Sequence, residues 1–267
     1  QSIVIFAVTY MAIISERFPR HWVALIGGGM LIITGVLTPL DALNYINWET
    51  LGLLSGMFVL VSILNEAGFF AWLAMTAIRK VNYQPAALFI VLVFLSSSLS
   101  MFMDSITVML FLSALTLQLT RLLKLDPIPV IIAEVCAANV GGAATLMGDP
   151  PNVILGTALG FSFNDFAINT GPISAIIAAT LLLVFYLLNR KSLIHAREML
   201  TSETISQIES IHRENTHAHM TRVGLIGFSM AVFLLIFHLP LSHVIGIHIN
   251  AATAALIPAV LSTFCIK

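Results

Sequence analysis

The chain has 267 residues, of which 58% are hydrophobic and only 9% are charged. Soluble domains contain about a quarter charged residues, so a chain this poor in charge needs lipid as the solvent for most of its surface. A formal net charge of −1 excludes a basic surface for nucleic acid, and no nucleic-acid partner is expected. We therefore predict an all-α polytopic membrane protein, in which each crossing needs about 20 apolar residues.

Apolar stretches follow one another along the chain and predict a series of spans. They cover residues 3–14, 23–36, 51–64, 85–119, 128–159, 173–188, 223–237 and 251–266. A shorter stretch, residues 69–80, ends in Arg79 and Lys80 and suits an interfacial helix. In the third span, Gly52 and Gly56 have the spacing of small residues at a close helix contact.

Basic residues fall in alternate connections between these spans. The connections at residues 38–50, 160–171 and 239–250 contain no Lys or Arg. Because positively charged loops stay in the cytoplasm, we place all 12 basic residues on the cytoplasmic face, with residues 85–120 entering and leaving on that face. The helices at residues 3–14 and 223–237 then run in opposite senses, which predicts an inverted repeat.

This topology predicts three regions. Residues 1–188 form a first transmembrane repeat of scaffold helices, an interfacial helix, a hairpin at 85–120, a broken helix at 128–159 and a closing helix at 173–188. Residues 189–221 form a cytoplasmic linker, and residues 222–267 begin a second, incomplete repeat, so we expect the native protein to continue past Lys267. A metal site at His212, His217 and His219 is the alternative for the linker, but no Cys or acidic partner has the spacing of a tetrahedral site.

Polar residues interrupt the double-length span at 85–120. Asp104, Ser105 and Thr107 lie near its middle, and a carboxyl group at mid-membrane depth marks a functional site. The span is either a re-entrant hairpin or two complete helices joined by a tight turn. In a re-entrant hairpin, the second arm would point its free N–H groups and its positive dipole end towards Asp104, where a small ion could bind.

A second interruption divides the span at 128–159. Three glycines, Asp149 and two consecutive prolines cannot continue an ordinary helix, so we expect it to stop near Gly141 and restart near Val153. Because lipid cannot satisfy the freed backbone groups, this segment must line a cavity or a protein surface. Glu134, before the break, is either a proton carrier or a buried carboxyl group bonded to a neighbouring helix.

Both interruptions resemble motifs of the ion transporter superfamily, and most closely those of permeases like the melanosomal P protein. Residues 102–110, FMDSITVML, resemble its LDN-V-T-T hairpin. Residues 132–152 resemble its AE…N-I-GG-A-A-T…GDPPN segment, and the likeness extends roughly over residues 51–188. The superfamily also includes arsenite pumps, sodium–proton antiporters, citrate carriers and sodium–dicarboxylate symporters.

The resemblance implies a homodimer of chains with two inverted repeats, each with a re-entrant hairpin and a broken helix. In the dicarboxylate branch, the hairpin tip has a Ser-Asn-Thr triplet, the broken helix reads Gly-Ser-Pro-Pro-Asn, and sodium and substrate bind there. Asp104-Ser105 and Asp149 stand at the corresponding places here, with Ser105 in place of the usual Asn.

These features predict a secondary active transporter of a small ion or small anionic solute in a bacterial inner membrane. Coupling to Na+ or H+ by an elevator-type movement would give either Na+/H+ antiport or ion-coupled carboxylate transport; no catalytic residue or other cofactor is expected. The predicted binding residues are Asp104, Ser105, Thr107, Asn139, Gly142, Thr145, Gly148, Asp149 and Asn152. Sodium is assigned to Asp104, Ser105, Asn139, Gly142 and Asp149, with Asp104 and Asp149 expected to approach each other.

Two other classes of protein fit the sequence less well. A passive ion channel needs a continuous polar pore, whereas the polar residues here gather only at mid-depth. An intramembrane aspartyl protease needs a Gly-x-Gly-Asp segment on a helix, whereas Leu146 occupies the place of the first Gly and two prolines follow Asp149.

Overall fold

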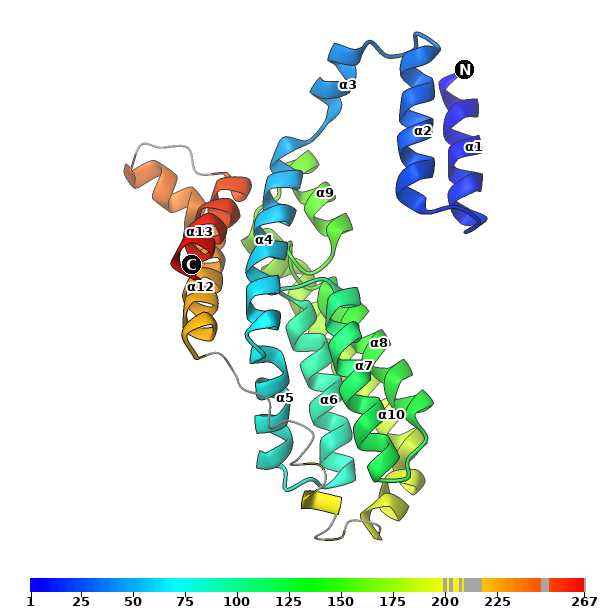
Figure 1. The fold of residues 1–267 in the computed structure, drawn as a ribbon, viewed down its shortest axis with the longest axis vertical. Helices are drawn as coiled ribbons and strands as arrows, with labels where there is room; N and C mark the ends of the chain where they lie inside the picture. Colours follow the sequence, from blue (N-terminus) through cyan, green and yellow to red (C-terminus); the bar gives the residue numbers. More distant parts are fainter. Residues whose placement is uncertain (199–200, 202–203, 207, 209–217, 246–249, 267) are drawn as a thin grey trace. The chain divides into compact units, whose positions relative to one another are not determined.

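The structure is a computed structural model that describes residues 1–198, 201, 204–206, 208, 218–245 and 250–266. Within these ranges the chain is helical and forms no strand (Figure 1). Four helical segments among the described residues are long and apolar enough to cross a membrane: Trp48–Glu66, Ser105–Leu122, Phe163–Arg197 and Ala218–Phe237. The predicted all-α polytopic membrane fold is therefore confirmed. The chain divides into two compact units, Gln1–Trp48 and Glu49–Lys267.

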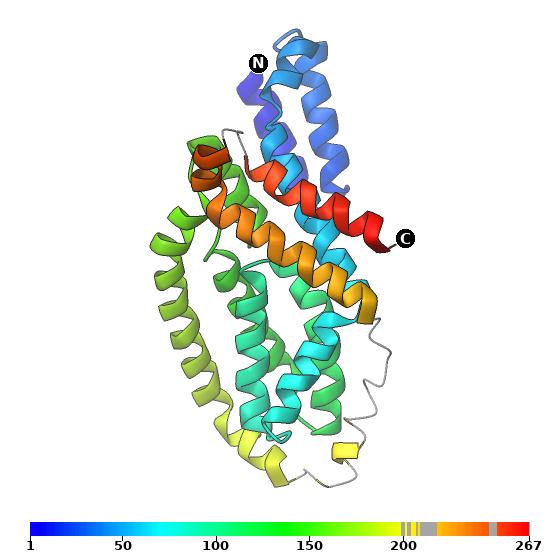
Figure 2. The same cartoon turned by 90° about the vertical axis from the view of Figure 1, so that its left-hand side faces the viewer.

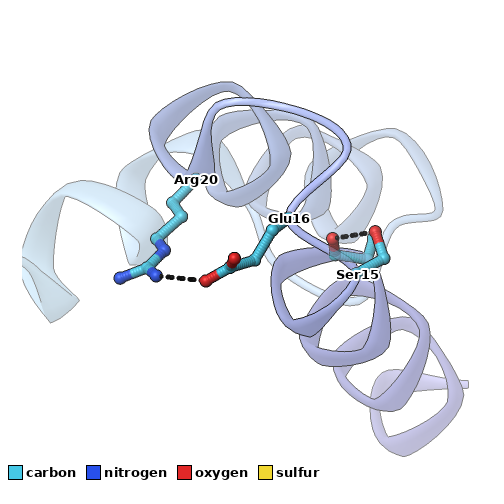
Figure 3. A network of polar contacts seen from close by, with 4 residues as sticks. Ser15, Glu16 and Arg20 are labelled. Carbon is cyan, nitrogen blue, oxygen red and sulfur yellow. Dashed lines mark hydrogen bonds and ion pairs between the residues drawn. The ribbon is translucent and has the colours of Figure 1, made fainter.

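The first unit is a helix pair followed by a short helix. Helices α1 (Ser2–Ile14) and α2 (Arg20–Ile33) pack against each other, with Thr9 directly beside Gly27. At their turn Arg20 Nη2 donates to Glu16 Oε1 at 2.8 Å (Figure 3), but this exposed pair is worth only about 0–1 kcal/mol. Helix α3 (Pro39–Tyr45) lies in the predicted 38–50 connection, and it forms because Thr38 and Asp41 make a capping box.

The second unit begins with a bent helix and a hairpin. Helix α4 (Trp48–Glu66) ends before Gly68, whose φ of 74° starts a new direction for α5 (Phe69–Lys80). Helix α5 buries Phe70 and Ile78 against the hairpin formed by α6 (Pro85–Ser100) and α7 (Ser105–Leu122). The interfacial position of α5 stays a prediction.

A broken helix packs against the hairpin. Helix α8 (Pro127–Gly142) contacts α6, α7 and the long helix α10 (Phe163–Glu198), and α9 (Pro150–Leu159) follows the break. The hairpin tip lies beside the break, and α9 extends beyond it in both views (Figures 1 and 2). A tip at this level, part-way along α10, favours a re-entrant hairpin over two complete helices.

Helix α10 is longer than the predicted closing helix at 173–188. It begins at Phe163 because Ser162 and Asp165 cap each other: Ser162 N and Oγ both donate to Asp165 Oδ2 at 2.7 Å. It then continues through Pro172 and into the predicted linker as far as Glu198. His212 and His217 lie outside the described residues, so the alternative of a metal site in the linker is not tested.

The last helices, α12 (Ala218–Ile245) and α13 (Ala251–Ile266), pack against each other and against α4. Gly52 lies beside Ala252, and Gly56 lies against the backbone of Ala255, which confirms their role in close helix packing. Glu49 Oε1 accepts a hydrogen bond from the first amide of α13, Ala251 N, at 3.0 Å. The inverted relation of this helix pair to α1 and α2 stays a prediction.

We predict that Arg79 and Arg121 face the same side of the membrane. They occupy the last turns of α5 and α7, and those two ends lie at the same end of the second unit in both views (Figures 1 and 2). Arg79→Cys and Arg121→Cys, made in a full-length protein without other cysteines, should react with a membrane-impermeant maleimide from one side only. Labelling from opposite sides would exclude the re-entrant hairpin.

Candidate functional site

The hairpin tip is organised by Asp104, which caps helix α7. Its Oδ1 accepts from Ile106 N at 3.0 Å and from Thr107 N at 3.1 Å, and its Oδ2 accepts from the Thr107 hydroxyl. A cap of this kind stabilises a helix by about 1 kcal/mol. Both carboxylate oxygens of Asp104 are therefore directed at the first turn of its own helix.

Asp149 binds the same helix end from the broken helix. It precedes α9 at the N-cap position, yet its side chain makes no hydrogen bond to α9. Instead Asp149 Oδ1 accepts from Ser105 Oγ at 3.0 Å and from Ser105 N at 3.4 Å. Two carboxylates thus meet at the positive end of α7, which stabilises negative charge.

The freed carbonyl groups of the break are satisfied by side chains. Asn152 Nδ2 donates to Gly142 O at 3.0 Å and to Thr145 O at 2.9 Å, which closes the break upon itself. Thr170 Oγ1 of α10 lies 2.7 Å from Phe166 O of its own helix and 3.1 Å from Ala144 O, so its one hydroxyl hydrogen is shared between the helix and the break. Thr145 in turn donates to the carbonyl of Met101, so the break is also tied to the hairpin tip. These bonds give carbonyl groups at the break partners that lipid could not supply.

Two glycines allow the backbone segments to come this close. A Cβ atom on Gly142 would collide with the carboxylate of Asp149, and a Cβ on Gly148 would collide with the carbonyls of Gly142 and Ser100. Only a hydrogen atom fits at either position. Nearby, Ser100 Oγ is buried and has no hydrogen-bond partner. We call Asp104, Ser105, Gly142, Gly148 and Asp149 the tip cluster.

Asn139 lies at the edge of the tip cluster. Its amide donates to Val135 O on its own helix at 2.8 Å, and its side chain is exposed. It borders an open groove of about 320 Å³ between α7 and α8, lined by Ser105, Ile106, Met109, Leu110, Ser113, Val135 and Asn139. Ser105 therefore faces both the tip cluster and the groove.

Glu134 stands apart from the tip cluster. Its side chain is fully buried, and its Oε1 accepts from Thr116 Oγ1 of α7 at 2.6 Å. Thr116 lies eleven positions after Ser105, about 16 Å further along the helix axis. Glu134 is thus bonded to a neighbouring helix, as one of its two predicted roles requires. Its other predicted role, as a proton carrier, stays a prediction.

The sequence analysis missed Ser100 and Thr170. Both are hydroxyl side chains in apolar helices, where most such groups simply bond their own backbone, as Thr180 does to Ile176 O at 2.8 Å. Nothing local distinguishes them; only the packing of α6 and α10 on the break does.

The tip cluster offers oxygen ligands without a dedicated metal site. Asp149 Oδ2 lies against Gly142, and Ser105 donates to the other carboxylate oxygen, Oδ1. Carboxylate, hydroxyl and carbonyl oxygens are the ligands of hard cations. No group of three or more His, Cys, Asp or Glu side chains in the described part of the chain could hold a metal ion.

Comparison with known proteins finds a family and relatives that are named as transporters. Residues 10–265 match the family described as citrate transporter. An uncharacterized transporter of Mycobacterium bovis is 30% identical over 262 residues, which cover 97% of this chain and 59% of that protein. The 46 kDa membrane protein of Mycobacterium leprae is 35% identical over 184 residues, 67% of this chain and 43% of that protein.

The P protein of Homo sapiens is 41% identical over 156 residues, which cover 57% of this chain and 19% of the P protein. The chain thus spans less than two thirds of the length of these relatives. The predicted relation to the ion transporter superfamily and to the P protein is confirmed. The chain is an integral membrane protein that belongs to the citrate transporter family, within the ion transporter superfamily.

Proposed function

We propose that this chain is part of a secondary active transporter that moves a small ionic solute, coupled to Na+ or H+, across a bacterial inner membrane. The supporting observation is the contact of Asp149 with Ser105, which joins the break to the positive end of α7. The mycobacterial relatives support the bacterial membrane. The assembly as a homodimer belongs to this proposal as well.

The tip cluster suits a coupling cation. Asp104 and Asp149 contribute two negative charges at one helix end, and neighbouring charges repel strongly where the dielectric constant is low. A sodium ion bound between the two carboxylates would relieve that repulsion. Ser100 Oγ, buried without a partner beside Gly148, is a further oxygen for sodium.

The transported solute would bind beside the cation. The open groove that Ser105 and Asn139 border contains two hydroxyl groups and one amide group, which suit a small carboxylate or another small ion. Citrate is the first solute to test, because the matching family is described as citrate transporter.

An elevator-type movement is the mechanism we propose for exchanging the site between the two faces. Helices α5, α6 and α7 share one buried apolar cluster with the end of α4, and α6 and α8 share another with α10. Elements packed in this way move together as a body. The tip cluster would then travel intact with the hairpin and α8.

We predict that Asp104→Asn and Asp149→Asn each weaken sodium binding about tenfold or more, equal to about 1.4 kcal/mol. Asparagine keeps the Oδ1 acceptor that caps α7 or receives Ser105, so the fold should survive while the charge is lost. Calorimetry on the full-length protein at several pH values measures the affinity, and citrate counterflow in liposomes measures transport.

Asp126→Asn is the matched control for this charge removal. Asp126 also caps a helix, with Oδ1 accepting from Ile128 N at 3.0 Å, but it is exposed at the start of α8. It should bind and transport like the parent. Parent-like sodium binding and counterflow in both Asp104→Asn and Asp149→Asn would show that these carboxylates are structural.

We predict that Gly142→Ala disrupts the tip cluster by displacing the carboxylate of Asp149. Its new Cβ would push the carboxylate of Asp149 away from Ser105, with a loss of stability of about 1–3 kcal/mol and a loss of counterflow. In Gly28→Ala the new Cβ meets no atom within 4 Å, so its melting temperature and counterflow should equal or exceed those of the parent. Equal behaviour of the two variants would contradict the close approach of Asp149.

A further inference from the structure

We propose that Glu134 and Thr116 form an enclosed binding site for a single proton, separate from the tip cluster, and that this proton is the one that drives transport. The role of this proton in driving transport rests on the proposed function, whereas the proton-binding site does not. Its basis is a carboxyl group with 0% exposure, one of whose oxygens has no partner.

The two oxygens of Glu134 differ in what surrounds them. Oε1 accepts a hydrogen bond of 2.6 Å from Thr116 Oγ1, so it behaves as the carbonyl oxygen of the group. Oε2 is buried and has no hydrogen-bond partner. A charged carboxylate in this position would keep its charge in an apolar interior without a counter-ion, at high cost, whereas a proton on Oε2 removes the charge.

The helices packed against α8 offer no nearby positive charge, among the described residues, that could neutralise Glu134 in place of a proton. Helix α8 packs against α6, α7 and α10. The sequence of α6 contains no titratable residue; α7 contains Arg121, which is exposed, and begins at its cap Asp104. Helix α10 contains no charged residue between Asp165 and Arg190, and its Tyr186 packs near Ala133. On α8 itself the only other titratable side chain is Cys136.

A metal ion does not fit this place. Sodium and other hard cations need several oxygen ligands, whereas the structure brings a single hydroxyl, that of Thr116, to Glu134. A proton needs one oxygen and little space. The chemistry of the site therefore selects a proton and leaves the metal cation to the tip cluster.

The position of the site links it to the tip cluster without merging the two. Glu134 lies eight positions before Gly142, about 12 Å along α8, and Thr116 faces it from the helix that begins at Ser105. The Glu134–Thr116 contact thus joins the same two helices whose other ends meet at Asp149. Loss of the proton would leave a buried charge at this joint and would favour a state in which water reaches it.

Infrared difference spectroscopy of the full-length protein tests the site without a transported solute. The parent should show the carbonyl stretching band of a protonated carboxyl group, with its characteristic shift in D₂O. Glu134→Gln should lose that band. In Thr116→Val the carbonyl loses its hydrogen bond, so the band should move to higher frequency rather than disappear.

Glu66→Gln, which changes an exposed carboxyl group at the end of α4, should leave the band unchanged. Each variant is first checked for a monodisperse gel-filtration peak. Absence of the band in the parent, or its persistence in Glu134→Gln, would overturn the proposal. So would an unchanged frequency in Thr116→Val, because the protonated group would then lie elsewhere.

Transport assays in liposomes, with citrate as the probe, test whether the proton on Glu134 drives transport. Glu134→Gln should keep citrate counterflow, which needs no net proton movement, and should lose uptake driven by a pH gradient together with its pH dependence. Proton-driven uptake at the parental rate in Glu134→Gln would overturn the coupling role. Absence of counterflow in the parent would instead contradict the proposed function and leave the infrared result standing.

Discussion

The constraint on which this structure depends is the interrupted backbone of the helix that contains Glu134. A break inside a membrane protein frees carbonyl groups that hydrocarbon cannot satisfy, so every freed group needs a partner from the chain itself. The amide of Asn152 donates to two of them, Gly142 O and Thr145 O. The hydroxyl of Thr170 lies 3.1 Å from a third, Ala144 O, and shares its one hydrogen with Phe166 O of its own helix. The break is therefore a built feature that requires an amide side chain at the start of α9 and a hydroxyl group on α10.

The position of the hairpin follows from that requirement. The break also contains the large side chains of Leu146 and Met147, which pack into an apolar cluster, so another backbone can approach it closely only where a glycine leaves room. Gly141 lies against the carbonyl of Ser97, and Gly148 lies against the carbonyl of Ser100. The end of α6 thereby comes to the break, and the turn that follows brings the first residue of α7 to Asp149.

Sequence reasoning located the break and the hairpin because proline, glycine and aspartate are costly in an apolar helix, and the observed break at residues 143–149 lies inside the expected interval. The sequence did not predict which group each polar side chain would bond. Asp104 was expected at an ion site, and its oxygens also cap α7. Glu134 lies only five positions before Asn139, yet it faces Thr116 and not the tip, because helical rotation decides which neighbour a side chain meets.

Satisfaction of hydrogen bonds separates the polar groups of this membrane interior into two kinds. Asn152 and Thr170 donate to carbonyl groups of the break, and Thr145 donates from the break to Met101 O of the hairpin tip. These side chains stabilise the fold, because losing their hydrogen bonds would leave backbone groups without partners. In the described part of the chain, the buried side-chain oxygens without a partner are Ser100 Oγ, Glu134 Oε2 and Thr221 Oγ1. Unpaired buried oxygens are unfavourable in the state that lacks their ligand. Ser100 Oγ lies beside the tip cluster, where an arriving cation would bind it. Glu134 Oε2 lies at the joint of α7 and α8, where an arriving proton would remove the charge of the carboxylate.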